Sequence, residues 1–241
     1  MDKKEELLSE LVKRLQEAYG GDLQSVILYG SGAMSDHHTK YSNLNVLCVL
    51  TRLGLEDLRK GQRTVEWWTK QKQPAPLLVT QEEVACRGDV YPIEFLDIQQ
   101  SHRVLHGADP FASIQVDRTN HRRQVEHELA SGLLRLRQRY LVLHPNNKDV
   151  LRLMLDSISS FATLARHALM IAQTGTGAAA PAKKREVFAA AAAGFALDAA
   201  PFETVLQLRE ESVKLDGNQV PALFASYLDQ ITKLEEAVDK L

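Results

Sequence analysis

Two groups of small polar residues stand where one apolar strand ends and the next begins, within VILYGSGAMSDHHTKYSNLNVLCVL at residues 26–50. Gly30, Ser31 and Gly32 close the first apolar run, and Ser42, Asn43 and Asn45 open the second. A glycine turn after a strand presents backbone N–H groups to an anion, and a serine hydroxyl can fix that anion in place. These glycines and serines are therefore predicted to bind phosphate groups.

The two asparagines occupy alternate positions at the mouth of the second expected strand. Side chains at i and i+2 of a strand point to the same face, so Asn43 and Asn45 should project together while Leu44 turns away into packing. Two carboxylates at this spacing would hold the Mg²⁺ ions that accompany a triphosphate. An amide oxygen brings no charge, and each lost charge removes a few kcal/mol of attraction at an effective dielectric constant of about 20.

The elements around these residues follow from hydrophobic periodicity and turn residues. Helices are expected over residues 3–19 and 54–72, and strands over residues 25–30, 45–50, 75–79 and 91–98. The run NVLCVL is apolar without alternation, as in a central strand covered on both faces. Thr80 and Glu83 have the spacing of a capping box, which predicts that a helix begins there.

The character of the chain changes after about residue 115, where long amphipathic helices replace the strands. Helices are expected over residues 119–144, 148–173 and 218–240, with two shorter ones before the last. The sequence thus predicts an α+β protein. A small mixed sheet flanked by helices would occupy residues 1–115, and an all-α helical bundle would occupy residues 116–241.

A strand that ends in Gly30-Ser31, then about eleven residues, then Ser42-Asn43-Leu44-Asn45 before an apolar strand resembles a known signature. It is similar to that of the DNA polymerase β-like nucleotidyltransferase superfamily, in which the last group reads Ser-Asp-x-Asp. The bacterial antibiotic adenylyltransferases of that superfamily also continue into a helical bundle. The resemblance covers the first 110 residues or so by motif. It implies that Gly30 and Ser31 bind the triphosphate of a nucleotide and that Asn43 and Asn45 stand at metal positions.

The resemblance also implies a third carboxylate from a later strand, in an apolar-acid-apolar context. Glu94, between Ile93 and Phe95, fits that context best, and Asp97 fits it from a later position. Asp36, in the segment between the two motif strands, is a weaker metal candidate, and the neighbouring His37 and His38 lack a third separated ligand. One remaining carboxylate does not replace three, so no metal ion is expected, and Mg²⁺ binding should be weakened or absent.

These residues favour a catalytically degenerate nucleotidyltransferase-fold protein that keeps phosphate or nucleoside triphosphate binding and serves a regulatory or scaffold role. One alternative is an active Mg²⁺-dependent adenylyltransferase that modifies a small hydroxylated substrate. It requires Asp36, Glu94 or Asp97 to carry the metals, or a natural sequence with aspartates at both asparagine positions. A second alternative is an interaction module without a ligand. Arg139 and His144, separated by four residues, also have the spacing of a class of ribonucleases. A ribonuclease is therefore a further alternative, although such spacings also arise by chance.

Composition narrows the function classes further. The net charge of −2 argues against a protein whose main work is to coat nucleic acid or an anionic membrane. The two cysteines, Cys48 and Cys86, indicate a reducing compartment rather than a disulfide framework. With no secretory signal and no apolar run of about 18 residues, a cytoplasmic protein is expected. Its expected partners are a nucleotide or small molecule, and a protein or second copy bound through the helical domain.

Overall fold

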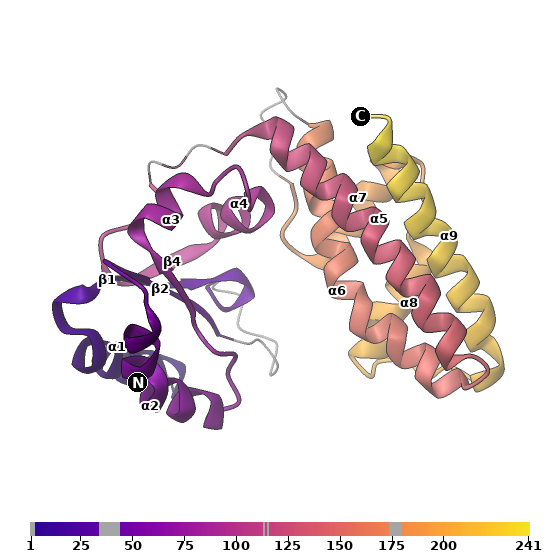
Figure 1. Ribbon diagram of the computed structural model, residues 1–241. Helices are drawn as coiled ribbons and strands as arrows, with labels where there is room; N and C mark the ends of the chain where they lie inside the picture. Colours follow the sequence, from indigo (N-terminus) through magenta and orange to yellow (C-terminus); the bar gives the residue numbers. More distant parts are fainter. Residues whose placement is uncertain (1–2, 34–43, 113, 115, 174–179) are drawn as a thin grey trace. The chain divides into compact units, whose positions relative to one another are not determined.

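The computed structural model describes residues 3–33, 44–112, 114, 116–173 and 180–241, apart from the side chain of Ser31. The chain divides into two compact units, Met1–Asp117 and Arg118–Leu241. The first contains the sheet and the second is built from helices (Figure 1). Across the described residues, no helix combines the length and the apolar character needed to cross a bilayer.

The sheet of the first unit has four strands in the order β3-β2-β1-β4. The strands are β1 (Leu23–Tyr29), β2 (Asn45–Leu50), β3 (Leu77–Thr80) and β4 (His102–Gly107). Strand β1 pairs antiparallel with both β2 and β4, whereas β2 pairs parallel with β3. The predicted α+β class with a small mixed sheet is therefore confirmed.

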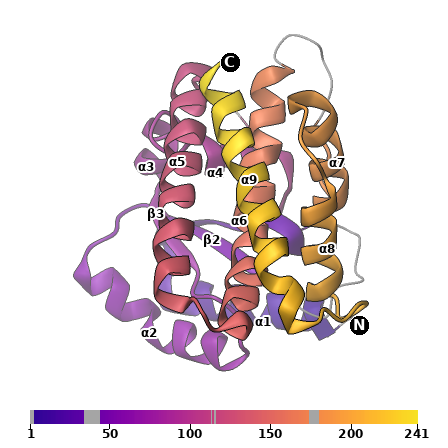
Figure 2. The ribbon, with the colours of Figure 1, turned by 90° about the vertical axis from the view of Figure 1, so that its right-hand side faces the viewer.

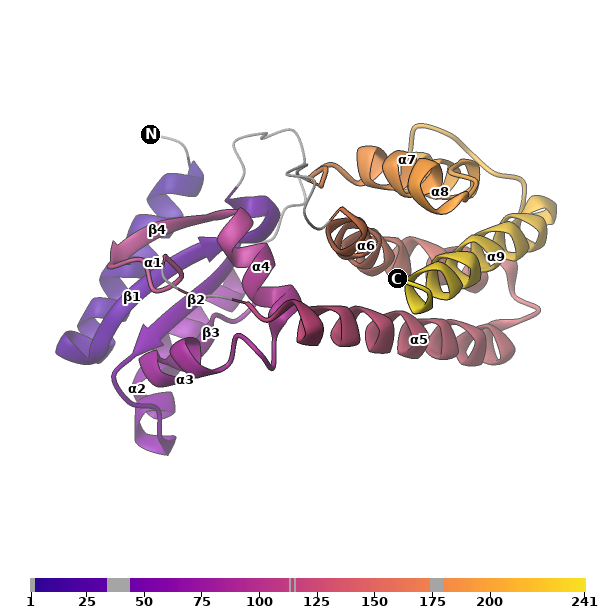
Figure 3. The same ribbon diagram turned by 90° about the horizontal axis from the view of Figure 1, so that it is seen from above.

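Helices cover both faces of this sheet (Figure 3). They are α1 (Lys3–Tyr19), α2 (Leu55–Lys70), α3 (Gln81–Cys86) and α4 (Pro92–Gln100). Leu11 and Leu15 of α1 and Trp68 of α2 belong to the core on one face, and Val84 of α3 and Phe95 of α4 belong to the core on the other. This explains why β2 lacks alternation, since both of its faces are buried.

The prediction of a fourth strand over residues 91–98 is wrong. It forms α4, with Pro92 in the first helical turn, where its missing N–H costs nothing and its fixed φ favours the helix. The apolar residues that suggested a strand pack instead as the buried side of a short helix. The fourth strand is β4, which begins two residues after α4 ends and which the sequence did not predict.

The second unit consists of helices that pack around α6. It contains α5 (Arg118–Leu143), α6 (Asn147–Ala172), α7 (Lys184–Phe195), α8 (Ala200–Arg209) and α9 (Val220–Asp239). Helices α5 and α9 lie alongside α6, and α7 and α8 also pack against it (Figure 2). Aromatic rings fill part of the core, where Phe188 stacks on Phe202 and Tyr227 meets Phe161 edge-on. The predicted helices of the second half are thus confirmed.

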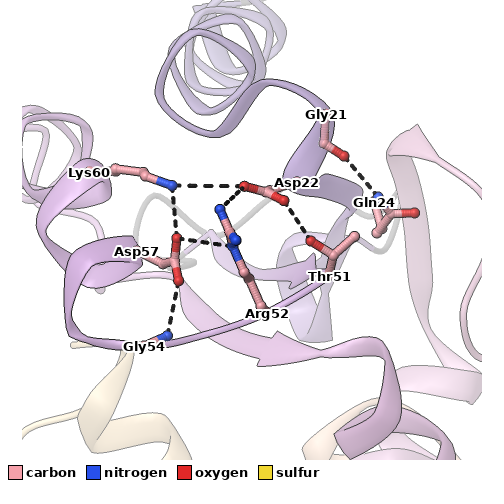
Figure 4. Close-up of polar contacts among 8 residues, drawn as sticks. All are labelled: Gly21, Asp22, Gln24, Thr51, Arg52, Gly54, Asp57 and Lys60. Carbon is pink, nitrogen blue, oxygen red and sulfur yellow. Dashed lines mark hydrogen bonds and ion pairs between the residues drawn. The ribbon is translucent and has the colours of Figure 1, made fainter.

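Four charged residues, called here the Asp22–Asp57 cluster, join the start of β1, the end of β2 and the start of α2 (Figure 4). They are Asp22, Arg52, Asp57 and Lys60. Lys60 Nζ lies 2.9 Å from Asp57 Oδ1 and 3.8 Å from Asp22 Oδ2. Arg52 also reaches both carboxylates, at 3.4 Å from Asp22 and 3.9 Å from Asp57.

Hydrogen bonds in this cluster favour the ionised carboxylates. A bond from the Thr51 hydroxyl, 2.7 Å long, holds the pKa of Asp22 below its ordinary value. Bonds from Lys60 and from the Gly54 N–H do the same for the pKa of Asp57. A carboxyl whose pKa is lower in the folded state stabilises the fold above its unfolded pKa of about 4, and that contribution is lost as pH falls through the folded pKa.

We expect Asp57→Asn to lower stability at pH 7 and to change it less at pH 2, because the stabilisation from the ionised carboxyl is lost as pH falls through its lowered folded-state pKa. Urea unfolding midpoints at the two pH values measure this difference. Glu56→Gln is the matched control, because Glu56 is an exposed carboxylate one residue away whose ion pair is with Arg59 in the same helix. An equal flattening of the pH dependence in both variants would contradict the assignment to Asp57.

Candidate functional site

The turn after β1 has a backbone that only glycine adopts without strain. Gly30 opens the short turn Gly30–Gly32 with a φ of +71°. A Cβ atom on Gly30 would lie 3.2 Å from Nδ2 of Asn45. Two features therefore favour glycine at position 30: the left-handed backbone conformation and the close approach of the Asn45 amide. The two motif residues that lie 15 positions apart in the sequence are neighbours in space.

Strand pairing fixes the direction in which Asn45 points. It is the first residue of β2 and lies opposite Tyr29, the last residue of β1. Leu44 is only 5% exposed and belongs to the core under α1 and α2, so the prediction that it packs away is confirmed. By alternation, Asn45 lies on the other face, with Leu47 and Val49.

Several predicted site residues lie outside the described residues. They are Ser42 and Asn43 of the motif, the metal candidate Asp36 with its neighbours His37 and His38, and the side chain of Ser31. The expectation that Asn43 and Asn45 project to a common face therefore stays a prediction.

Backbone groups of the turn already have partners within the first unit. The Gly30 N–H donates to the Ser101 carbonyl at 3.2 Å, and the Gly30 carbonyl accepts from the Ala33 N–H at 2.9 Å. Lys4 Nζ, from the first turn of α1, donates to the Gly32 carbonyl at 2.6 Å. One of the N–H groups expected to face a phosphate is thus engaged, whereas a lysine that the sequence did not point to reaches the turn.

The candidate third carboxylates lie on a helix rather than on a strand. Glu94 is in the first turn of α4 and Asp97 is in its middle, so the predicted strand context of both is wrong. Glu94 nevertheless acts electrostatically on Tyr29, the last residue of β1. Burial raises the pKa of Tyr29, and the negative charge of Glu94 raises it further. Tyr29 immediately precedes Gly30, so this carboxylate influences the residue next to the turn.

The strands that follow the motif carry no acidic residue. Strand β3 reads LLVT and β4 reads HRVLHG. Strands β2 and β4 both flank β1, so the strands beside the turn contribute Asn45 and His102 but no carboxylate. In the part of the chain that the structure describes, no group of three or more His, Cys, Asp or Glu side chains could hold a metal ion.

The structure also places His102 at this end of the sheet, opposite Tyr29. Its Nδ1 lies 2.7 Å from the Ile98 carbonyl and its Nε2 lies 3.1 Å from Asp109 Oδ2. Both partners are acceptors, so the ring makes both bonds only when both nitrogens carry a proton. The bonds tie the end of α4, the start of β4 and the segment after β4 together. No motif in HRVLHG marks this residue, which is why the sequence did not single it out.

Comparisons with known proteins add one finding about the fold. No family model matches the chain, and no curated protein matches it in sequence. A solved structure of spectinomycin adenyltransferase AAD(9) from Enterococcus faecialis, with ATP and spectinomycin, superimposes with a TM-score of 0.60 at 13% sequence identity. The match covers 98% of this chain and 99% of that one. The fold is nucleotidyltransferase-like.

Within this nucleotidyltransferase-like fold, the turn after β1 and the mouth of β2 meet as the sequence resemblance implies. What differs is the chemistry of the side chains there. The described site offers an amide, a lysine, a histidine bound to a carboxylate and a glutamate on a helix. Among the described residues, that set offers an amide and a lysine ammonium as hydrogen-bond donors, and a glutamate carboxylate as an oxygen ligand.

Replacing Gly30 tests the strained turn directly. We expect Gly30→Ala to lower the free energy of unfolding by roughly 1–2 kcal/mol, because alanine pays for a left-handed conformation that glycine adopts freely. Gly21→Ala is the matched control, since a Cβ atom there meets nothing within 4 Å and its φ is not positive. The control should change the free energy by no more than about 0.5 kcal/mol. Equal effects in chemical denaturation would contradict the role of the Gly30 conformation.

Proposed function

We propose that the first unit is a degenerate nucleotidyltransferase domain that binds a nucleoside triphosphate, or its phosphate chain, and transfers no nucleotidyl group at a useful rate. The chain would then act as a regulatory or scaffold protein. In this proposal Gly30, Ser31, Gly32 and Ser42 contact phosphate, and Asn43 and Asn45 occupy the positions where the resembled enzymes place metal ligands.

One observation carries the proposal. The motif end of the sheet presents the neutral amide of Asn45 against the Gly30 turn, and neither β3 nor β4 supplies a carboxylate. Two-metal catalysis depends on negative ligands that hold both ions at the attacking and leaving oxygens. Glu94 comes from α4 and is one charge where three are needed. The site therefore favours anion binding over metal-dependent transfer.

The structural neighbour supports the choice of nucleotide. That protein was solved with ATP and spectinomycin, and its fold matches nearly the full length of this chain. The same match is the observation that favours a second candidate function, an active Mg²⁺-dependent adenylyltransferase acting on a small hydroxylated substrate. In that candidate Glu94, beside Tyr29, would be a metal ligand or a base.

The scaffold role is supported by apolar surface on the second unit. Leu134, Leu141 and Val142 of α5 are 64%, 78% and 79% exposed. Large apolar side chains left this open on one helix are a typical protein-contact surface. We place the binding of a protein partner, or of a second copy of the chain, on this helix.

Calorimetric titration of the chain with ATP, in EDTA and in excess Mg²⁺, separates the candidates. We expect binding whose affinity changes by less than about threefold between the two conditions, without pyrophosphate release, because the site lacks the charges that recruit the metal. Tight binding that requires Mg²⁺, together with steady pyrophosphate release, would overturn the degenerate reading. Absence of binding in both conditions would favour the interaction module.

Restoring the motif gives a second test. We expect the double variant Asn43→Asp, Asn45→Asp to leave pyrophosphate release at background, because the later strands still supply no third carboxylate. Asn218→Asp, in the second unit, controls for the added charge itself. Brisk pyrophosphate release by the double variant alone would show that the remaining site is competent and that only the two aspartates had been lost.

A further inference from the structure

Helix α5 carries apolar side chains on two sides. Val125, Leu129 and Leu133 are buried on the side that packs within the second unit. Leu134 and Leu141 lie seven positions apart, close to two helical turns, and both are exposed. An amphipathic helix at a protein surface normally carries one apolar stripe, so a second stripe on the outward side indicates a second contact.

The outward side is called here the Leu134–Val142 stripe and consists of Leu134, Gln138, Leu141 and Val142. These residues follow the spacing i, i+4, i+7 and i+8, which places them on one face of the helix. All four are exposed. Two helices that pack along their length contact one another through residues at this spacing. The stripe therefore has the pattern of a surface that receives another helix.

The charges beside the stripe on α5 are all of one sign. Residues 129–143 of the helix include Arg135, Arg137 and Arg139 but no acidic residue. Each arginine lies three or four positions from a member of the stripe, so the arginines border it. They precede the last helical turn, which contains no basic residue, so attraction to the helix dipole does not account for them.

Only part of this charge is balanced within the described residues. Arg135 lies 3.6 Å from Glu128 in a pair whose side chains are both exposed. Arg137 donates to the Thr232 hydroxyl of α9 at 3.4 Å, and that hydroxyl is neutral. For the exposed Arg139, the described residues supply no carboxylate at ion-pair distance. The border of the stripe is therefore positive, and a partner with negative charge would complement it.

We propose that the Leu134–Val142 stripe binds an acidic amphipathic helix of another protein. The inference rests on the proposed scaffold function, because it names the chemistry of the partner that α5 would contact. Apolar side chains of the partner cover Leu134, Leu141 and Val142, and its Asp or Glu side chains meet the arginines at the rim.

The same charges disfavour other occupants of the stripe. A second copy bound across a two-fold axis would place this stretch of α5 on itself and bring arginines against arginines. The net charge of −2 works against an anionic membrane or nucleic acid, since both carry far more negative charge than one acidic helix.

The test uses three synthetic helical peptides, each about three heptads long. The acidic peptide has leucine at the a and d positions and glutamate beside them. The second peptide has lysine in place of the glutamates, and the third keeps the glutamates but has glutamine in place of the leucines. In fluorescence anisotropy, we expect the acidic leucine peptide to bind the chain at least about tenfold more tightly than either of the others, because it alone matches both the stripe and its charge.

Variants of the stripe test its location. The double variant Leu134→Gln, Leu141→Gln should weaken binding of the acidic leucine peptide by about tenfold or more. Arg139→Glu should weaken it as well and should strengthen binding of the lysine peptide. Leu55→Gln is the matched control, because Leu55 on α2 is as exposed as Leu134, at 64%, and it should change the affinity by less than about twofold. Circular dichroism shows whether each variant keeps its fold.

Three results would overturn the proposal. The first is that wild type does not bind the acidic leucine peptide, or binds it no better than the double leucine variant does. The second is a dimer in analytical ultracentrifugation that the double variant converts to monomer, which would assign the stripe to a second copy. The third is binding to phosphatidylserine vesicles that depends on the same two leucines.

ATP calorimetry on the same samples keeps this inference apart from the proposed nucleotide binding. If the chain binds ATP but not the acidic leucine peptide, the partner assignment fails and nucleotide binding stands. If it binds the peptide through the stripe but does not bind ATP, nucleotide binding fails and the partner assignment stands.

Discussion

Burial of strand β2 on both faces is the constraint on which the site depends. Val46, Cys48 and Leu50 enter the core under α1 and α2, and the two residues between them enter the core under α3 and α4. The apolar run alone does not select a register, but the step from buried Leu44 to Asn45 does, because a slip of one residue would exchange the two between core and turn. The observed register places Asn45 opposite Tyr29 and against Gly30, so strand pairing and packing set the position of the amide.

The electrostatic character of the site follows from what stands around this amide. The described neighbours are a glycine turn, a lysine bound to a carbonyl of that turn, and a histidine that makes two bonds to acceptors. Glu94 approaches from a helix, and its charge is felt by the Tyr29 hydroxyl. Neutral, positive and negative groups thus lie together on a nucleotidyltransferase-like backbone, which is the basis of the proposal that an anion binds here.

Sequence reasoning identified the parts of the fold that have local signals. The capping box at Thr80 is present, with the Thr80 hydroxyl accepting from the Glu83 N–H. Cys48 is fully buried as expected of a core thiol, and burial raises its pKa to about 12. Periodicity also located the long helices, because each buries a regular stripe of apolar side chains.

The sequence-based predictions failed where the signals for a helix and for a strand were similar in strength. The apolar run around Glu94 suits a strand or a short buried helix, and the proline in its first turn decided for the helix. Strand β4 was missed because HRVLHG is half polar and its pairing with β1 is a long-range contact. Lys4 could not have been predicted for the same reason, since nothing near it in the sequence indicates the turn it contacts.

The alternation of Leu44 and Asn45 has a consequence for how this site can diverge. Asparagine and aspartate have nearly the same shape, so an exchange between them alters charge while the strand, the register and the glycine turn persist. A codon gained or lost within β2 would act differently, because it would carry leucine to the turn and drive an amide into the core. Sequence drift in such a protein is therefore channelled into replacements that change the charge of the site while its shape persists.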